Sequence, residues 1–140
     1  MAELSRSAKQ STMNIKLLRS VALAAAITIG GSVALFAGEA PKEDAAMAAK
    51  LITAIAKSDH QGFIADGDAP FRQFKKQQFE AVSGQLAPKL QAGHEISYLG
   101  ELKQKGFRVT LWKLSFKDGS DDALATLSVK AGKVGGFFIR

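Results

Sequence analysis

The sequence has no cysteine, and it has only two histidines, one tyrosine and one tryptophan among its 140 residues. The absence of cysteine excludes a disulfide framework, a Cys-ligated zinc site, a thiol nucleophile and a lipid-modified cysteine anchor. Basic residues outnumber acidic ones, but they are scattered along the chain and form no stripe at helical spacing. Because nucleic-acid-binding domains gather such charges on one face, we expect no nucleic-acid partner. We also expect no cofactor and no bound metal.

The first 37 residues differ in kind from the rest of the chain. They hold four basic side chains and one acidic side chain, and Lys16 and Arg19 stand just before an uncharged run from Val21 to Phe36. A short positive segment followed by an apolar run and small residues is typical of a secretory signal peptide. We therefore predict a signal peptide over residues 1–37.

Cleavage is expected after Ala37 or after Ala40, where small residues follow the apolar run. The twelve residues before Met13 do not resemble a signal, so our hypothesis is that the true start is Met13. The folded part would then be exported, to the periplasm or outside the cell. The alternative is an uncleaved signal that anchors the protein in a membrane, although the apolar run is at the short limit for spanning a bilayer.

The exported part is long enough for one folded domain. We read residues 38–44 as a linker and residues 45–140 as a single domain, since a chain of this length supports one hydrophobic core. Apolar residues recur at three- and four-residue steps from Glu43 to Lys57, which predicts an amphipathic helix. A short helical turn and a loop are expected from "HQGFIADGDAPF", because its glycines and its proline interrupt regular secondary structure.

A second long helix is predicted from Phe74 to Gln91. Pro88 removes a backbone donor inside it, so a bend or an interruption is expected there. Gly93 is expected to end this helix in the left-handed conformation.

Four segments with the composition of β-strands follow this helix. They are "HEISYLGEL", "FRVTLWKLSF", "ALATLSVK" and "VGGFFIR". Short glycine-containing turns join them, which predicts an antiparallel meander. The predicted fold class is therefore α+β, with N-terminal helices packed on a curved four-stranded antiparallel sheet.

Three carboxylates gather between Asp118 and Asp122, in the segment that joins the second and third strands. An EF-hand calcium loop that began at Asp118 would need a glutamate at its twelfth position, which is occupied by Val129. Asp118–Gly119 is instead a turn signal, and we interpret the acidic segment as a solvated loop.

The second strand is apolar on both of its faces. Phe107, Val109 and Leu111 fall on one face, and Trp112 and Leu114 fall on the other. Either the strand carries a bulge or both faces are covered, and two helices can cover only one face of such a sheet. We therefore expect the outer face of the sheet to pack against a second copy of the chain, as a homodimer.

The order of elements resembles the nuclear transport factor 2-like superfamily. The resemblance covers about Ala45 to Arg140 and is carried by "ITAIAKSDHQGF", "QFEAVSGQLAPKLQAG" and "LWKLSFKDGSDDALATLSVKAGKVGGFFI". It resembles the small exported members of that superfamily, whose function is not settled. The resemblance implies a cone-shaped fold, a pocket between helices and sheet, and dimerisation through the outer face of the sheet. It implies no activity, because function belongs to the site rather than to the fold.

Candidate acid–base residues are few. Enzymes of this superfamily use a carboxylate with a tyrosine, or a histidine with an acid, inside the cone. The residues of those types here are His60, His94, Asp66, Asp68 and Tyr98. The alternative is that both histidines stand at the ends of elements, in water.

Candidate residues for the lining of a ligand pocket are aromatic. We predict Phe63, Phe71, Trp112 and Phe138, because these would stand at the boundary between helices and sheet. The predicted function is that of an exported module that binds a small apolar ligand or a protein. The alternative is a small isomerase, dehydratase or hydrolase with acid–base residues in the cone.

Overall fold

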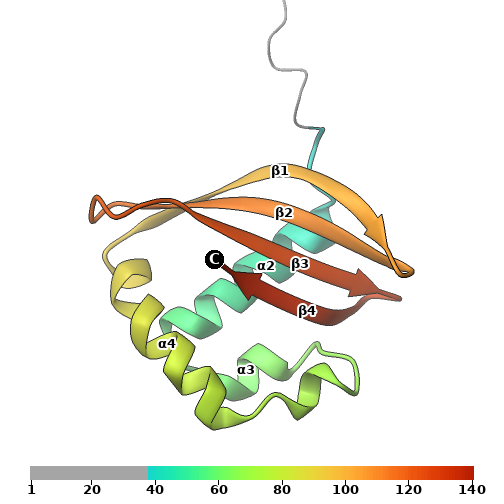
Figure 1. The fold of residues 1–140 in the computed structure, drawn as a ribbon, viewed down its shortest axis with the longest axis horizontal. Helices are drawn as coiled ribbons and strands as arrows, with labels where there is room; N and C mark the ends of the chain where they lie inside the picture. The colour runs from blue at the N-terminus through green and yellow to red at the C-terminus, as the bar shows by residue number, and fades with distance from the viewer. Residues whose placement is uncertain (1–37) are drawn as a thin grey trace, which may run out of the picture. The chain divides into compact units, whose positions relative to one another are not determined.

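A computed structural model describes residues 38–140, which form an α+β domain with its helices on one side of an antiparallel sheet (Figure 1). The helical segments are α2 (Lys42–Ala56), α3 (His60–Ile64), the 3-10 turn η1 (Phe71–Gln73) and α4 (Lys76–Gln91). The strands are β1 (His94–Gln104), β2 (Phe107–Phe116), β3 (Ala123–Lys130) and β4 (Lys133–Ile139). The predicted signal peptide lies outside the described residues. Within residues 38–140, no helix has the length and apolarity to cross a membrane.

The predicted helices are confirmed, with their ends shifted by one or two residues. α2 begins at Lys42, inside the segment read as a linker. α4 begins at Lys76, two residues after the predicted start, and runs through Pro88 to Gln91 as one helix. Gly93 has a φ of 117°, the left-handed region expected for the residue that ends a helix.

The strands form an antiparallel meander in the order β1-β2-β3-β4, as predicted. The turns at Lys105–Gly106 and Ala131–Gly132 have positive φ at both residues, which is the condition for a two-residue type I′ hairpin. Bulges interrupt the β1–β2 register at Tyr98/Gly100 and the β3–β4 register at Ser128/Val129. β2 itself pairs with β3 without a register shift, so the bulge that we considered for β2 lies in β1 instead.

The core lies between the helices and the inner face of the sheet. Leu51, Ile52 and Ile55 of α2 pack in one cluster with Phe79 of α4 and Leu114 of β2. All five side chains are almost fully buried. The helices therefore cover the inner face of the sheet, and β1 and β4 are its two edges.

Candidate functional site

The two candidate histidines are each held by a backbone carbonyl. The Nε2 atom of His60 lies 2.7 Å from the carbonyl oxygen of Phe74, and its ring packs against Phe79. The Nδ1 atom of His94 lies 2.9 Å from the carbonyl oxygen of Leu90, in the last turn of α4. Both side chains are partly buried. These contacts give each ring a structural role where α4 begins and where it ends.

The other acid–base candidates also have partners of their own. Asp66 pairs with Lys50, and the Oδ1 atom of Asp68 accepts a hydrogen bond from the backbone N–H of Phe71 at 2.9 Å. Burial raises the pKa of Tyr98, with a smaller contribution from the negative charge of Glu101. Within the described residues, no hydrogen bond or ion pair joins any two of the five candidates.

The predicted pocket residues separate into two places. Phe63, Phe71 and Phe138 come together beside β4, where they line the hollows described below. Trp112 lies in the core instead, with 4% of its surface exposed. Its Nε1 atom donates to Thr110 Oγ1 at 2.9 Å, and its ring packs edge-on against Tyr98.

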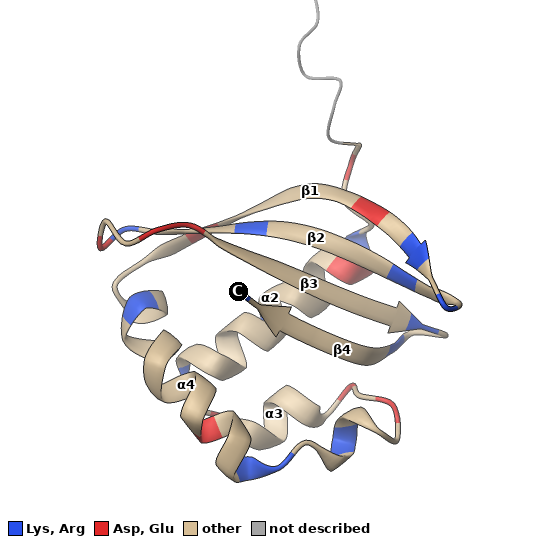
Figure 2. Cartoon of the chain, in the orientation of Figure 1, with Lys and Arg blue, Asp and Glu red and all other residues tan. Residues whose placement is uncertain are grey.

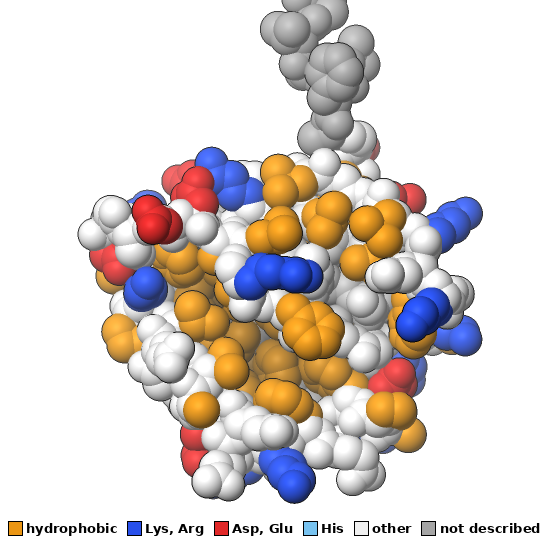
Figure 3. Space-filling model, viewed as in Figure 1, with side chains coloured by type: hydrophobic (Ala, Val, Ile, Leu, Met, Phe, Trp, Pro, Cys, Tyr) orange, Lys and Arg blue, Asp and Glu red, His pale blue; other side chains and the backbone are white. Residues whose placement is uncertain are grey.

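Two adjoining apolar hollows lie along β4, with volumes of about 170 and 220 Å³. Both are lined by Phe63, Phe74, Phe137 and Phe138, so they form one continuous depression that we call the phenylalanine groove. Figure 3 shows apolar side chains gathered in a hollow between the sheet and the helices. The first hollow adds Ile55, Phe79, Val82 and Ile139. The second adds Pro70, Phe71, Gly135 and Gly136.

Phe63 is the centre of the groove floor. Its ring centroid lies 5.0 Å from that of Phe79, 5.3 Å from that of Phe71 and 5.9 Å from that of Phe74. Asp59 holds α3 in place beneath it by accepting a hydrogen bond from the N–H of Gly62 at 2.9 Å. Aromatic pairs at these separations are favourable, so the floor is a packed layer rather than a set of loose side chains.

The glycine pair of β4 shapes the rim of the groove. A side-chain carbon on Gly135 would lie 2.3 Å from the Phe107 ring, and one on Gly136 would lie 3.1 Å from the Phe138 ring. Gly135 is also the unpaired residue of the β3–β4 bulge. Both glycines therefore make room for aromatic rings.

A third hollow, which we call the polar hollow after the charged and amide side chains among its lining residues, lies beside η1. It has a volume of about 560 Å³ and is lined by Gly67, Asp68, Ala69, Arg72, Gln73 and Lys133. Arg72 and Lys133 bring two cations to this hollow, against the single acid Asp68. The basic residues of η1 and of the hairpin before β4 can be followed in Figure 2.

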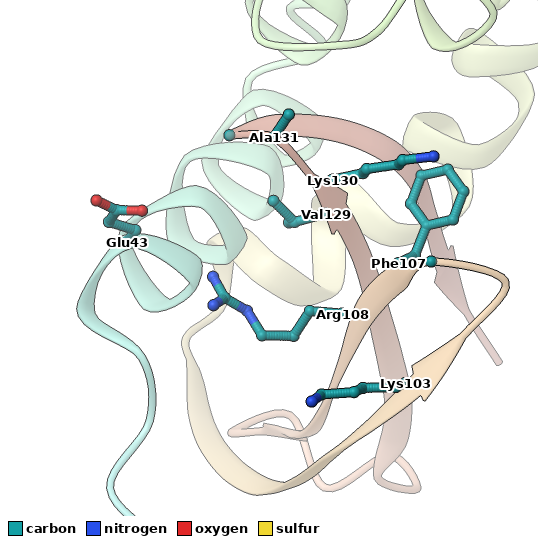
Figure 4. A pocket seen from close by; sticks show the side chains of 9 residues that line it. Glu43, Lys103, Phe107, Arg108, Val129, Lys130 and Ala131 are labelled. Carbon is teal, nitrogen blue, oxygen red and sulfur yellow. The ribbon is translucent and has the colours of Figure 1, made fainter.

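A further hollow of about 440 Å³ lies near the start of α2, with Glu43, Lys103, Arg108 and Lys130 in its lining (Figure 4). Lys103 and Arg108 point toward α2, whereas Lys130 points the other way, beside the ring of Phe107. Three cations that do not converge make a poor anion site.

Arg108 instead forms an ion pair that stabilises the fold. Its Nε and Nη2 atoms donate to the two carboxylate oxygens of Asp44 at 2.8 and 2.6 Å, and this hydrogen bonding raises the pKa of Arg108. Asp44 is fully buried, while the Arg108 side chain is 40% exposed. The pair joins the first turn of α2 to β2 and has no signal in the local sequence.

The acidic segment after β2 is a turn, as interpreted from the sequence. Asp118 Oδ1 accepts hydrogen bonds from both the hydroxyl and the N–H of Ser120, and these bonds lower the pKa of Asp118. Asp122 pairs with Lys113 at 3.0 Å.

No family model, curated protein or solved structure matches this chain. Its candidate function therefore rests on the geometry of the groove.

Proposed function

We propose that the domain is a binding module that takes an apolar ligand in the phenylalanine groove. The observation that carries this proposal is the composition of the groove: among residues 38–140, no ionisable side chain lines either of its two hollows. Phe138 stands at the rim with 64% of its surface exposed, the largest value among the exposed large apolar side chains of residues 38–140. An exposed aromatic beside an apolar hollow is typical of a contact site rather than of a closed core.

Export and homodimerisation belong to the same proposal. Export rests on the signal-like residues 1–37. A dimer through the outer face of the sheet is supported by Leu99 and Leu102 of β1, which are 48% and 42% exposed. Figure 3 shows apolar side chains clustered over β1 and β2. The nuclear transport factor 2-like cone is supported by the element order, with helices first and a four-stranded antiparallel sheet after them.

The alternative of a small isomerase, dehydratase or hydrolase has less support. Acid–base catalysis needs groups that reach one reacting atom together. His60, His94, Asp66 and Asp68 each have a separate partner, and Tyr98 packs against Trp112.

The test is a titration with an anilinonaphthalene sulfonate dye, which fluoresces when it enters an apolar site. The protein is purified from its own host in the form that the host produces. Phe138→Ala removes the rim of the groove, and Met47→Ala is the control, because Met47 is a partly buried apolar residue of α2 that lines neither hollow. We expect Phe138→Ala to weaken dye binding about tenfold, which corresponds to about 1.4 kcal/mol of lost apolar contact. Equal weakening by both variants, or no dye binding by the unaltered protein, would refute the proposal.

A further inference from the structure

The backbone of β4 has unused hydrogen-bonding groups beside the groove. Arg140 exchanges two backbone hydrogen bonds with Leu124, at 2.8 and 3.0 Å. Because paired groups alternate along an antiparallel ladder, Phe138 also turns its N–H and C=O toward β3. Phe137 and Ile139 therefore turn theirs away from β3, toward the open edge. Within residues 38–140, no hydrogen bond from a loop or a side chain reaches these groups.

Only the first part of this edge is covered. Val134 donates its N–H to Asp66 at 2.9 Å and accepts from the N–H of Asp68 at 2.8 Å, through an isolated parallel bridge at Gly67. The loop that contains Gly67 thus already pairs with β4 as a short added strand. The edge from Gly135 to Ile139 continues the same line, and no strand or loop of the described part of the chain pairs with it.

The two edges of the sheet differ in how they are protected. β1 carries Glu95, Glu101 and Lys103 and a bulge at Tyr98/Gly100, which are the usual devices that stop an edge strand from pairing with another chain. β4 has no charged side chain between Lys133 and its last residue, Ile139. An unprotected apolar edge is an aggregation risk unless it has a partner.

The groove provides places for the side chains of such a partner. The hollow with Gly135 and Gly136 and the hollow with Ile139 follow one another along β4. Alternate side chains of an extended chain point to the same side, about 6.6–7 Å apart. Successive inward side chains of a strand paired with β4 would therefore meet these two hollows in turn.

The charges at the ends of β4 indicate what flanks this apolar core. Lys133 precedes the open edge and shares the polar hollow with Arg72, and Arg140 follows the edge. Asp68, the one acid in that hollow, already accepts a hydrogen bond from Phe71. An occupant with acidic residues on either side of its apolar segment fits both ends.

We propose that the occupant of the phenylalanine groove is an extended peptide segment of another protein, which adds a fifth strand to the sheet at β4. The peptide pairs with the free N–H and C=O groups of Phe137 and Ile139. Its alternate apolar side chains enter the two hollows, and its acidic flanks meet Lys133 and Arg140. Backbone pairing supplies affinity and the hollows supply specificity, as in other cases of strand addition. This inference rests on the proposed function, because it names the class of apolar ligand that the groove takes.

The first experiment is a selection from a displayed library of short random peptides, against the protein as its host produces it. Selected sequences are expected to alternate apolar residues and to carry acidic residues at their ends. The amide hydrogen exchange of the complex is then measured by nuclear magnetic resonance. Exchange of the Phe137 and Ile139 amides should slow at least tenfold on binding, whereas that of Phe138, already paired with β3, should change little.

Two matched variants separate backbone pairing from side-chain contact. Ile139→Pro removes the free N–H, and Ile139→Ala keeps the N–H and removes the side chain. Proline is tolerated at an edge position whose N–H faces away from the sheet, so both variants are expected to fold. The proline variant should bind the selected peptide at least tenfold more weakly than the alanine variant does. Selected peptides that bind both variants equally, or that leave the exchange of Phe137 and Ile139 unchanged, would overturn the inference.

The remaining outcomes separate this inference from the proposed function. If the dye binds at Phe138 but the library yields no peptide, the groove takes a small apolar molecule and strand addition is wrong. If neither binds, the proposed function fails with it. If the Phe137 and Ile139 amides are protected without peptide and lose that protection on dilution, a second copy of the chain occupies the edge, and the inference is again wrong.

Discussion

The ion pair between Asp44 and Arg108 should respond unequally to the removal of its two partners. Asp44 is fully buried in the first turn of α2, whereas the side chain of Arg108 is 40% exposed. Arg108→Met keeps most of the apolar stem but leaves a buried carboxylate without its two donors. Breaking a buried pair in this way costs about 3–5 kcal/mol. Asp44→Ala leaves a guanidinium that water can reach, so the cost should fall to about 1.5–3 kcal/mol, the contribution of hydrogen bonds to a charged group.

The assay is urea unfolding followed by tryptophan fluorescence. Trp112 is the single tryptophan of the chain and is buried in the core, so its emission reports the loss of packing at β2. Domains of this size have about 5–15 kcal/mol of stability in total, so either variant should shift the transition clearly. A third variant with Asp44→Leu and Arg108→Met together should recover most of the loss, since apolar replacement of a buried pair is often neutral. The reasoning would be refuted if Asp44→Ala cost as much as Arg108→Met.

Two further predictions concern β1 and the glycine pair of β4. Because burial raises the pKa of Tyr98 above 10.0, the folded state holds this proton more tightly than the unfolded state does. Stability should therefore be retained below about pH 10 and lost as the pH rises further, and Tyr98→Phe should lessen that loss in urea titrations on either side of this pH. Gly135→Ala should cost about 1–3 kcal/mol by crowding the Phe107 ring, and a double-mutant cycle should show a smaller cost in a Phe107→Ala background.

The strands were predictable because two local signals agree along them. β2 and β3 have the predicted bounds, since alternating apolar residues end at glycine-containing turns on both sides. β1 extends two residues beyond its predicted end, to Gln104. The type I′ turn at Lys105–Gly106 allows pairing right up to the turn, and Gln104 and Phe107 are the last pair.

The site was predictable only in part, because its residues meet through tertiary packing. Phe63, Phe71 and Phe138 were chosen as residues at the boundary between helices and sheet, and the structure brings them together. Trp112 was chosen on the same ground. Its position on the inner face of β2 and its bond to Thr110 place it in the core instead. Asp44 and Arg108 are 64 positions apart and have no periodic pattern in common, so no reading of local sequence could pair them.

The candidate binding site at the open edge of β4 follows from the topology of the sheet rather than from a motif in the sequence. In any meander the last strand is an edge, so "VGGFFI" could be placed at an edge from its position alone. Its lack of charge then conflicts with the rule that exposed edges carry protective charges. The conflict is resolved if a peptide pairs with this edge when the protein functions. Residues of α3 and α4 beside β4 then give the bound peptide an apolar surface to pack against. If the edge were instead simply exposed, charged substitutions such as Phe138→Lys would improve solubility and leave every binding property unchanged.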